Sequence, residues 1–188
     1  MEDVVEAGEL VVLTGSPGTG KTTVARLLAD EMSSSVHLHA DDFWRFIRRG
    51  GIMPYLPGAR RQNAVVMEVL AGAACGYAGG GFHVVVDGVV GPWFLDRFSR
   101  AAGEAGLGLH YVVLRADEET TVARGAGRGE GELTDPEVLR GMYAQFADLG
   151  PLEAHVLDNG GLDAVGTAAA VREGIAEGRF LLPASPDA

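Results

Sequence analysis

The strongest chemical pattern in the sequence is at residues 15–22, which read Gly-Ser-Pro-Gly-Thr-Gly-Lys-Thr and match G-x-x-x-x-G-K-S/T in full. Glycine at three of these positions lets the backbone curl with its N–H groups turned inward, where a Cβ would collide with phosphate oxygens. Lys21 can reach the β- and γ-phosphates of a nucleotide as a point charge, and the hydroxyl of Thr22 can bind Mg²⁺. The predicted nucleotide-binding residues are Gly15, Ser16, Pro17, Gly18, Thr19, Gly20, Lys21, Thr22 and Thr23.

The lysine of this pattern is the only one in the chain, because 14 of the 15 basic residues are arginine. A position that keeps lysine, where every other basic residue is arginine, needs a compact ammonium group rather than a planar guanidinium group. An apolar run precedes the loop, and a helical pattern with Val24, Leu27 and Leu28 follows it. A bound anion would therefore rest at a helix N-terminus, where unpaired N–H groups and the helix dipole favour negative charge.

A second chemical candidate is Asp87, which ends the apolar run that starts at Val84. An acid at the carboxyl end of a strand suits a Mg²⁺ site, so Thr22 and Asp87 are the predicted metal residues; a purely structural Asp87 is the alternative. Gly88 follows, where hydrolytic motor ATPases place a glutamate, and this argues against a motor. The guanine signature Asn-Lys-x-Asp needs a second lysine, which the chain lacks.

Composition limits the class of protein further. The 188 residues are 47% hydrophobic and 22% charged, which fits one domain spanning 1–188. No apolar run approaches the roughly 18 residues of a membrane span, and the first residues are acidic, so we expect a cytoplasmic protein. The single cysteine, Cys75, agrees with a reducing compartment and is predicted to be buried. A net charge of −11 disfavours nucleic acid as a partner.

Short β-rich runs alternate with longer helical patterns, which predicts an α/β fold with a parallel sheet covered on both faces. We expect strands at 10–14, 36–40, 83–87, 109–114 and 154–157, and helices at 20–32, 42–49, 59–78, 92–105, 117–124, 135–148 and 162–177. One face of the third helix is predicted to carry Val65, Val66, Val69, Leu70, Ala73 and Tyr77. Thr134, with Pro136 and Glu137 after it, is predicted to cap the sixth helix.

Three segments depart from the regular alternation. Residues 50–58 are rich in glycine and proline, and residues 125–132 carry glycine at alternate positions. Both are candidate lid or specificity loops, with plain connectors as the alternative, and the lid is predicted at about 125–134. The tail at about 182–188 is expected to fray.

Four segments together resemble the small P-loop kinases, which include chloramphenicol phosphotransferase, gluconate kinase, shikimate kinase and the kinase half of phage polynucleotide kinase. The segments are Gly15 to Thr23, the run His39-Ala40-Asp41-Asp42-Phe43-Trp44-Arg45, the pair Arg124 and Arg128, and the stretch Val138 to Tyr143. The resemblance covers most of residues 10–160. It implies a P-loop NTPase fold, with a five-stranded parallel sheet in the order 2-3-1-4-5 and a small lid.

The resemblance also implies roles for particular residues. Asp41 falls on the acid that orients and deprotonates the acceptor hydroxyl, with Asp42 as the second choice and helix capping as the alternative. Independently, the carboxyl end of strand two lies beside the P-loop, so a carboxylate there can face the γ-phosphate. Arg124 and Arg128 flank the lid and are predicted to neutralise charge on the β- and γ-oxygens when it closes, unless they are solvated helix-end residues.

Other polar and aromatic residues near this edge have two interpretations each. His37 and His39 share a strand face with Asp41, but no third ligand has recognisable spacing, so we interpret them as structural rather than as a metal site. Three aromatic residues are expected near the mouth, where they could wall a substrate or pack in the core: Trp44, Tyr55 and Trp93. The clustered arginines could grip a substrate or lie on the surface: Arg45, Arg48, Arg49, Arg60 and Arg61.

The sequence therefore predicts an enzyme that uses ATP and Mg²⁺ to phosphorylate a hydroxyl of a small molecule, a metabolite or an antibiotic. One alternative keeps the chemistry and makes the acceptor a polynucleotide 5′-hydroxyl, against which the acidic balance of the chain counts. Another is a nucleotide-binding or ATPase protein that transfers no phosphate.

Overall fold

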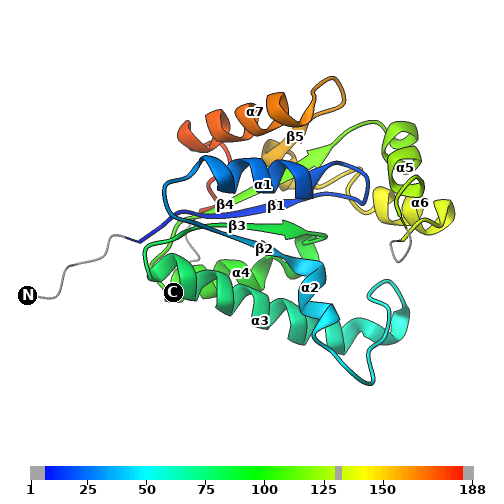
Figure 1. Ribbon diagram of the computed structural model, residues 1–188, viewed down its shortest axis with the longest axis horizontal. Helices are drawn as coiled ribbons and strands as arrows, with labels where there is room; N and C mark the ends of the chain where they lie inside the picture. Colours follow the sequence, from blue (N-terminus) through cyan, green and yellow to red (C-terminus); the bar gives the residue numbers. More distant parts are fainter. Residues whose placement is uncertain (1–6, 130–132, 184–188) are drawn as a thin grey trace, which may run out of the picture.

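The computed structural model describes residues 7–129 and 133–183, and its centre is a parallel sheet of five strands (Figure 1). The strands lie in the order β2-β3-β1-β4-β5, which confirms the predicted order. Their bounds are β1 Leu10–Thr14, β2 Ser35–His39, β3 His83–Gly88, β4 Leu109–Arg115 and β5 Val156–Asp158. Each strand begins and ends within about two residues of its predicted position.

Helices cover both faces of the sheet, as its buried strands require. Alternate side chains of β1 enter two separate cores: Leu10 and Val12 lie in one, and Val11 and Leu13 in the other. Helices α3 (Arg60–Gly79) and α4 (Pro92–Glu104) close the first core. Helices α1 (Lys21–Glu31) and α7 (Ala164–Ala176) close the second, on the opposite face in Figure 1.

The remaining helices gather near the carboxyl end of the strands. Figure 1 shows α5 (Glu118–Ala126) and α6 (Pro136–Ala144) beyond this end on one side, and α2 (Ala40–Arg45) with the segment that follows it on the other. Two short 3₁₀ helices complete the described elements, η1 at Pro57–Ala59 and η2 at Gly150–His155. This arrangement gives one end of the sheet a wall on each side.

Side-chain caps begin α5, α6 and α7, whereas α1, like α2, α3 and α4, begins without one. Asp117, Asp135 and Asp163 each accept a backbone N–H at the start of α5, α6 and α7. Helix α1 follows Gly20 in the left-handed conformation, with no side-chain cap. Its first N–H groups therefore remain open to another acceptor.

The predicted cap of α6 was wrong by one residue. Asp135, not Thr134, accepts from the N–H groups of Glu137 and Val138, at 2.8 and 3.4 Å. Pro136 then occupies the first helical position, where its missing N–H removes no hydrogen bond.

The predicted face of α3 was partly wrong. Val65, Val69 and Tyr77 are 57%, 56% and 46% exposed, whereas Val66 and Leu70 are buried. The helix instead lays a row of small residues, Ala71, Ala74 and Ala78, against the sheet. Because valine, alanine and glycine occur all round this helix, hydrophobic spacing alone does not select the buried face.

Several boundaries also differ from the sequence prediction, and α6 ends at Ala144 rather than at residue 148. Helix α2 spans residues 40–45 rather than 42–49. Gly125 belongs to α5 rather than to the lid; a Cβ there would lie 3.0 Å from Leu139, so glycine allows α5 and α6 to pack closely. Leu182 is tied down, because its N–H donates to the carbonyl of Leu109 at 2.9 Å. Residues 130–132 of the predicted lid and 184–188 of the tail lie outside the described residues.

Within residues 7–129 and 133–183, no helix combines the length and the apolar character that crossing a bilayer requires.

Candidate active site

The loop at residues 15–20 connects β1 to α1 and is held by its own hydrogen bonds. The carbonyl of Ser16 accepts from the hydroxyl of Thr19 at 3.0 Å and from the Nζ of Lys21 at 3.4 Å. Ser16, Thr19 and Lys21 are each at most 5% exposed. The loop therefore has a fixed shape, with an uncapped helix N-terminus directly behind it.

The glycines of this loop are required for different reasons. A Cβ at Gly18 would lie 2.0 Å from the carbonyl oxygen of Thr121, and one at Gly15 would lie 2.4 Å from that of Leu114. At these two positions the collision is with the protein's own backbone rather than with phosphate. Gly20 has a φ of 84° and open space where its Cβ would be, so it is the glycine that leaves room beside the loop.

Asp87 is fully buried at the end of β3 and is bonded on both carboxylate oxygens. Oδ2 accepts from the Thr22 hydroxyl at 2.6 Å, and Oδ1 from His37 Nε2 at 2.6 Å and His39 Nδ1 at 3.0 Å. Burial opposes ionisation of Asp87, but the hydrogen bonds from His37, His39 and Thr22 outweigh it and hold the pKa well below its usual range. The structure thus brings the two predicted metal residues, Thr22 and Asp87, into direct contact.

His37 and His39 donate to this carboxylate, a role that the sequence did not reveal. The hydrogen bond to Asp87 raises the pKa of His39, although partial burial opposes the change. The other ring nitrogen of His39, Nε2, lies 3.7 Å from Oδ2 of Asp41. His39 therefore stands between the buried acid of β3 and the exposed acid of α2. Among the described residues, no group of three or more His, Cys, Asp or Glu could hold a metal ion by itself.

The two neighbouring acids of α2 face different surroundings. Asp41 lines the larger cavity at the carboxyl end of the sheet. Asp42 is ion-paired with Arg45 at 2.9 Å and does not line this cavity. Neither side chain caps the helix, whose cap residue is His39. Asp41 lies in the first turn of α2 rather than at the end of β2, because the helix begins at Ala40.

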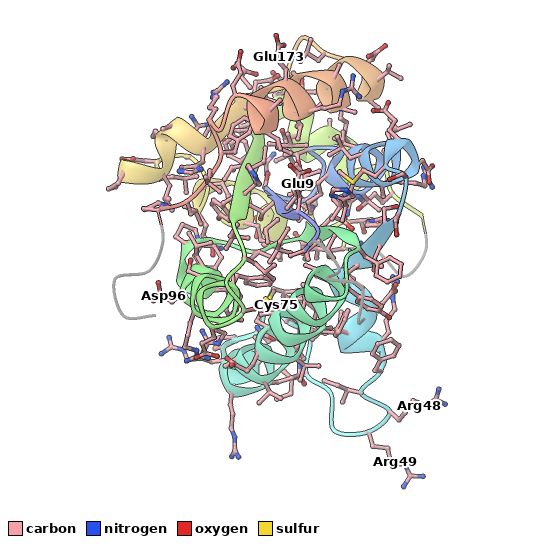
Figure 2. The ribbon with its side chains drawn as sticks, turned by 90° about the vertical axis from the view of Figure 1, so that its left-hand side faces the viewer. Glu9, Arg48, Arg49, Cys75, Asp96 and Glu173 are labelled. Atoms are coloured by element: carbon pink, nitrogen blue, oxygen red, sulfur yellow. The ribbon has the colours of Figure 1, made fainter. Side chains whose placement is uncertain are left out.

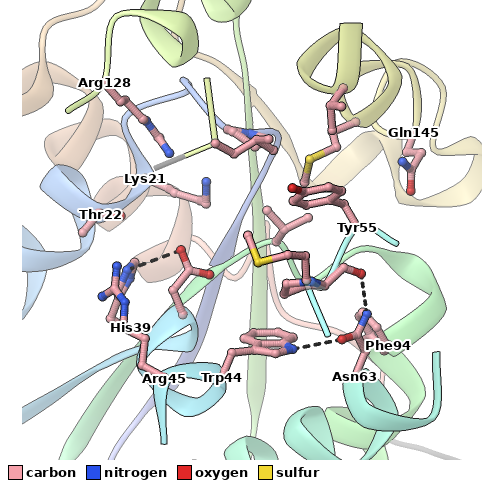
Figure 3. Close-up of a pocket in the computed structure, with 18 of the residues that line it drawn as sticks. Lys21, Thr22, His39, Trp44, Arg45, Tyr55, Asn63, Phe94, Arg128 and Gln145 are labelled. Carbon is pink, nitrogen blue, oxygen red and sulfur yellow. Dashed lines mark hydrogen bonds and ion pairs between the residues drawn. The ribbon is translucent and has the colours of Figure 1, made fainter. Parts of the chain in front are cut away.

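The larger cavity has a volume of about 1140 Å³ and joins the P-loop to the two walls at the end of the sheet (Figure 3). Gly20, Lys21 and Thr22 line it on the P-loop side, and Arg128 lies beside Lys21 in Figure 3. Asp41 and other residues of α2 line it as well, and residues of α6 contribute a further side. The cationic side chains beside the P-loop and a carboxylate therefore open into one space.

Residues 47–56, which we call the tethered loop, form a further side of this cavity. Gln62 holds the loop by two hydrogen bonds to the backbone of Ile52, at 2.8 and 2.6 Å. Asn63 donates to the carbonyl of Pro54 at 2.7 Å and accepts from the indole of Trp44 at 2.9 Å. The first turn of α3 thus fixes an irregular segment as a wall.

The aromatic residues expected near the mouth are confirmed as cavity lining: Trp44, Tyr55 and Trp93. Of the clustered arginines, Arg45 lines the cavity. Arg48 and Arg49 extend away from the body of the protein in Figure 2. Arg60 and Arg61 are exposed and lie outside the cavity lining.

The two lid arginines line different cavities. Arg128 lines the larger one, whereas Arg124 lines a smaller one of about 190 Å³ on the other side of the P-loop. Gly20 and Thr23 line both. Asn159 also lines the smaller cavity; its Nδ2 donates to the carbonyl of Thr19 at 2.9 Å, while its buried Oδ1 has no hydrogen-bond partner.

Sequence reasoning missed Gln62, Asn63 and Asn159. Asn159 had a usable signal, because a polar residue two positions after the strand predicted at 154–157 lies at the edge where ligands bind. Gln62 and Asn63 had none, since their partners are backbone groups of a loop whose path the sequence does not specify.

Comparison with known proteins agrees with this geometry. The AAA domain family model (AAA_18) matches residues 11–141, more than half of the chain, so the chain belongs to this family. No relative matches among curated proteins.

Three solved structures illustrate the likeness. The tunicamycin resistance protein of Deinococcus radiodurans is similar over 94% of this chain and 99% of its own, with a TM-score of 0.64 and 17% identity. A gluconokinase from Sinorhizobium meliloti 1021 is similar over 92% and 94%, with a TM-score of 0.65 and 16% identity. The APS kinase of Mycobacterium tuberculosis, in complex with AMPPNP and APS, is similar over 90% and 98%, with a TM-score of 0.70 and 17% identity. At these identities the likeness shows the fold, and the predicted resemblance to small P-loop kinases is confirmed.

Proposed function

We propose that this protein is an ATP- and Mg²⁺-dependent phosphotransferase that moves the γ-phosphate of ATP to a hydroxyl of a small molecule. The observation that carries the proposal is the shared cavity, into which Lys21 and Thr22 open from one side and Asp41 from another. Phosphoryl transfer depends on positioning and charge stabilisation, and this arrangement supplies both. The kinases among the structural neighbours support the same class of reaction.

The residues present fit a Mg-nucleotide. The open N-terminus of α1 and the space beside Gly20 suit the β- and γ-phosphates. The hydroxyl of Thr22 gives its proton to Asp87, so its oxygen lone pairs face outward as a hard ligand for Mg²⁺. When bound, the ion would neutralise charge on the phosphate oxygens. Because Gly20 and Thr23 line both cavities, the nucleoside part suits the smaller one, beside Arg124 and the unpaired Oδ1 of Asn159.

In the proposed reaction, Asp41 orients the acceptor hydroxyl and takes up its proton. The hydroxyl oxygen forms a bond to the γ-phosphorus while the bond to the β–γ bridging oxygen breaks, and ADP leaves. Lys21 and Arg128 neutralise the charge that moves onto the phosphate oxygens. Exclusion of water from the cavity would favour transfer over hydrolysis.

Replacing Asp41 by Asn tests the role of the base. We expect Asp41→Asn to lower transfer by about 10²–10⁴-fold, the usual contribution of a general base, while ATP affinity stays within about threefold. Asp42→Asn is the matched control, because Asp42 lies on the same helix as Asp41 and is similarly exposed, but its carboxylate lies outside the cavity. Transfer that survives in Asp41→Asn and is lost in Asp42→Asn would move the role to the neighbouring acid.

The acceptor is sought by coupled ADP release over sugars, shikimate-like acids, nucleosides and hydroxylated antibiotics. A 5′-hydroxyl oligonucleotide belongs in the same screen, because the stretch Val138 to Tyr143 resembles phage polynucleotide kinase. Slow ATP hydrolysis that no acceptor accelerates would instead favour a nucleotide-binding protein without transfer. Calorimetry with Mg²⁺ that detects no binding of ATP would remove the proposal altogether.

A further inference from the structure

We infer that the acceptor is an uncharged molecule that carries an aromatic or similarly broad apolar group beside its reactive hydroxyl, an inference that rests on the proposed phosphotransferase function. The larger cavity gathers large apolar side chains that the fold leaves exposed. Ile52, Met53, Tyr55 and Trp93 are 40–54% exposed, and all of them line it. Exposed apolar surface concentrated around one concave site is typical of a ligand-binding wall.

The apolar wall is built rather than incidental. Gln62 and Asn63 pin the tethered loop, and so hold Ile52, Met53 and Tyr55 at the cavity instead of letting them pack elsewhere. These hydrogen bonds use the amide groups of both side chains, so the amide atoms of Gln62 and Asn63 are occupied by the loop rather than left for a ligand. What the wall offers to a ligand is mainly its apolar side chains.

The ring of Trp93 is held in place by its neighbours. It makes edge-to-face contact with Phe146 at a centroid distance of 5.8 Å and with Phe94 at 6.1 Å. A Cβ at residue 91 would lie 2.3–2.5 Å from three atoms of this ring, so Gly91 makes room for the indole at the start of α4. A fixed ring that remains 46% exposed beside a cavity is an aromatic contact surface for a ligand.

Trp44 extends this surface toward the proposed base. It lies three residues after Asp41, so both side chains occupy one side of α2 and both line the cavity. Its Nε1 donates to Asn63, which turns the polar edge of the indole away from any ligand. Figure 3 shows Trp44, Tyr55 and Phe94 around the space that faces Lys21 and Arg128. An apolar group bound there would hold an attached hydroxyl near Asp41.

The charges around Asp41 and the apolar wall do not suit an acidic acceptor. Among the described residues, the lysine and arginine side chains that line the cavity are Lys21 and Arg128 on the P-loop side, and Arg45, which is paired with Asp42. His39 also lines it, but its two ring nitrogens already face Asp87 and Asp41. Arg48 and Arg49, the next arginines along the chain, point away from the body (Figure 2). A carboxylate next to the reactive hydroxyl would meet Asp41 with no dedicated cation, and one on the broad apolar group would lie against the apolar wall, so acidic acceptors are disfavoured.

The test compares matched probes on two scaffolds. Methyl, phenyl and 4-carboxyphenyl β-glucosides form one series, and propane-1,2-diol, 1-phenylethane-1,2-diol and its 4-carboxy derivative form the other. Binding is measured by ligand-observed NMR with the full chain, Mg²⁺ and AMPPNP, and transfer is measured separately with ATP. In at least one series we expect the phenyl compound to bind at least about tenfold more tightly than its small counterpart, and the carboxylate to lose most of that gain.

Variants of the cavity wall test which residues cause the preference for phenyl compounds. Trp93→Leu, which keeps an apolar side chain but removes the flat ring, should abolish most of the preference for phenyl compounds. Tyr55→Ala gives a second test at an exposed position if Trp93→Leu does not fold. Phe46→Ala is the control, because Phe46 is a 70% exposed aromatic residue outside the cavity lining, and the preference should persist there.

The outcomes separate this inference from the proposed function. Tight phenyl binding without transfer would support the aromatic site and count against phosphotransfer. Transfer only to the small or acidic probes would support phosphotransfer and overturn the inference. Absence of phenyl binding in both series, or a preference unchanged in Trp93→Leu and Tyr55→Ala, would also overturn it.

Discussion

Substituting Gly20 by alanine separates the backbone role of this glycine from its role beside the ligand. Gly20 has a φ of 84°, and its Cβ would meet no atom within 4 Å. The only cost to folding is therefore the left-handed conformation, about 1–2 kcal/mol for a residue with a Cβ. In a chain of this size that loss corresponds to a fall in Tm of about 2–8 °C.

Gly178 provides a control matched for strain. It has a φ of 71° and equally open space, but it follows α7 and lines neither cavity. Gly178→Ala should lose about as much stability as Gly20→Ala. Only Gly20→Ala should lose nucleotide affinity, because its methyl group would occupy the space proposed for a phosphate oxygen. Displacing one charge-assisted N–H···phosphate bond, about 1.5–3 kcal/mol, weakens binding by about 10–150-fold.

Two measurements decide the matter. Thermal unfolding without nucleotide gives the stability of both variants, and calorimetry with Mg²⁺ and AMPPNP at a temperature where both are folded gives the affinity. Equal affinities in Gly20→Ala and Gly178→Ala would refute the assignment of the space beside Gly20 to a phosphate. A much larger stability loss in Gly20→Ala alone would show that the residue is constrained by packing as well.

Two further predictions concern groups outside the reacting centre. The ion pair with Arg115 holds the pKa of Glu153 at about 2, below its ordinary 4.5, so the stability that this ion pair contributes is complete above about pH 4.5 and is lost as the pH falls toward 2. Urea unfolding from pH 6 to 3 should therefore show a smaller acid destabilisation in Glu153→Gln than in the wild type, and parallel curves would contradict this linkage. Gln62→Leu removes both hydrogen bonds to the tethered loop, about 1–2 kcal/mol in total at this exposed position, and should raise the KM for the acceptor by about 5–30-fold. The Kd for ATP should not change, and a loss confined to ATP binding would show that the loop serves the nucleotide instead.

The sequence predicted the fold well where the determinants are local. Each strand is a short apolar run bounded by turn residues, and the P-loop pattern identifies the strand and helix that flank the proposed phosphate site. The order of the strands came from the resemblance rather than from any spacing. Helix α3 marks the limit of periodicity, since Val65 and Val66 have the same hydrophobic character and only packing against the sheet makes one exposed and the other buried.

The candidate site was predicted only in part. Asp41, Lys21 and Thr22 were found from motif and resemblance, and the structure brings them to one cavity. The hydrogen bonds of His37 and His39 to Asp87 depend on the parallel register of β2 beside β3, in which His39 pairs with Asp87. Such contacts join residues about fifty positions apart, and no local pattern encodes them.

Because Lys21 is the one lysine of the sequence and is only 5% exposed, the protein offers a single, shielded side-chain amine to acylating chemistry. A nucleotide bearing an amine-reactive phosphate mimic would therefore have one lysine to modify, and a mass shift on the peptide that contains it would report occupancy directly. Bulk biotinylation or amine coupling to a sensor chip, by the same logic, would either miss the folded molecule's side chains or strike the nucleotide site itself.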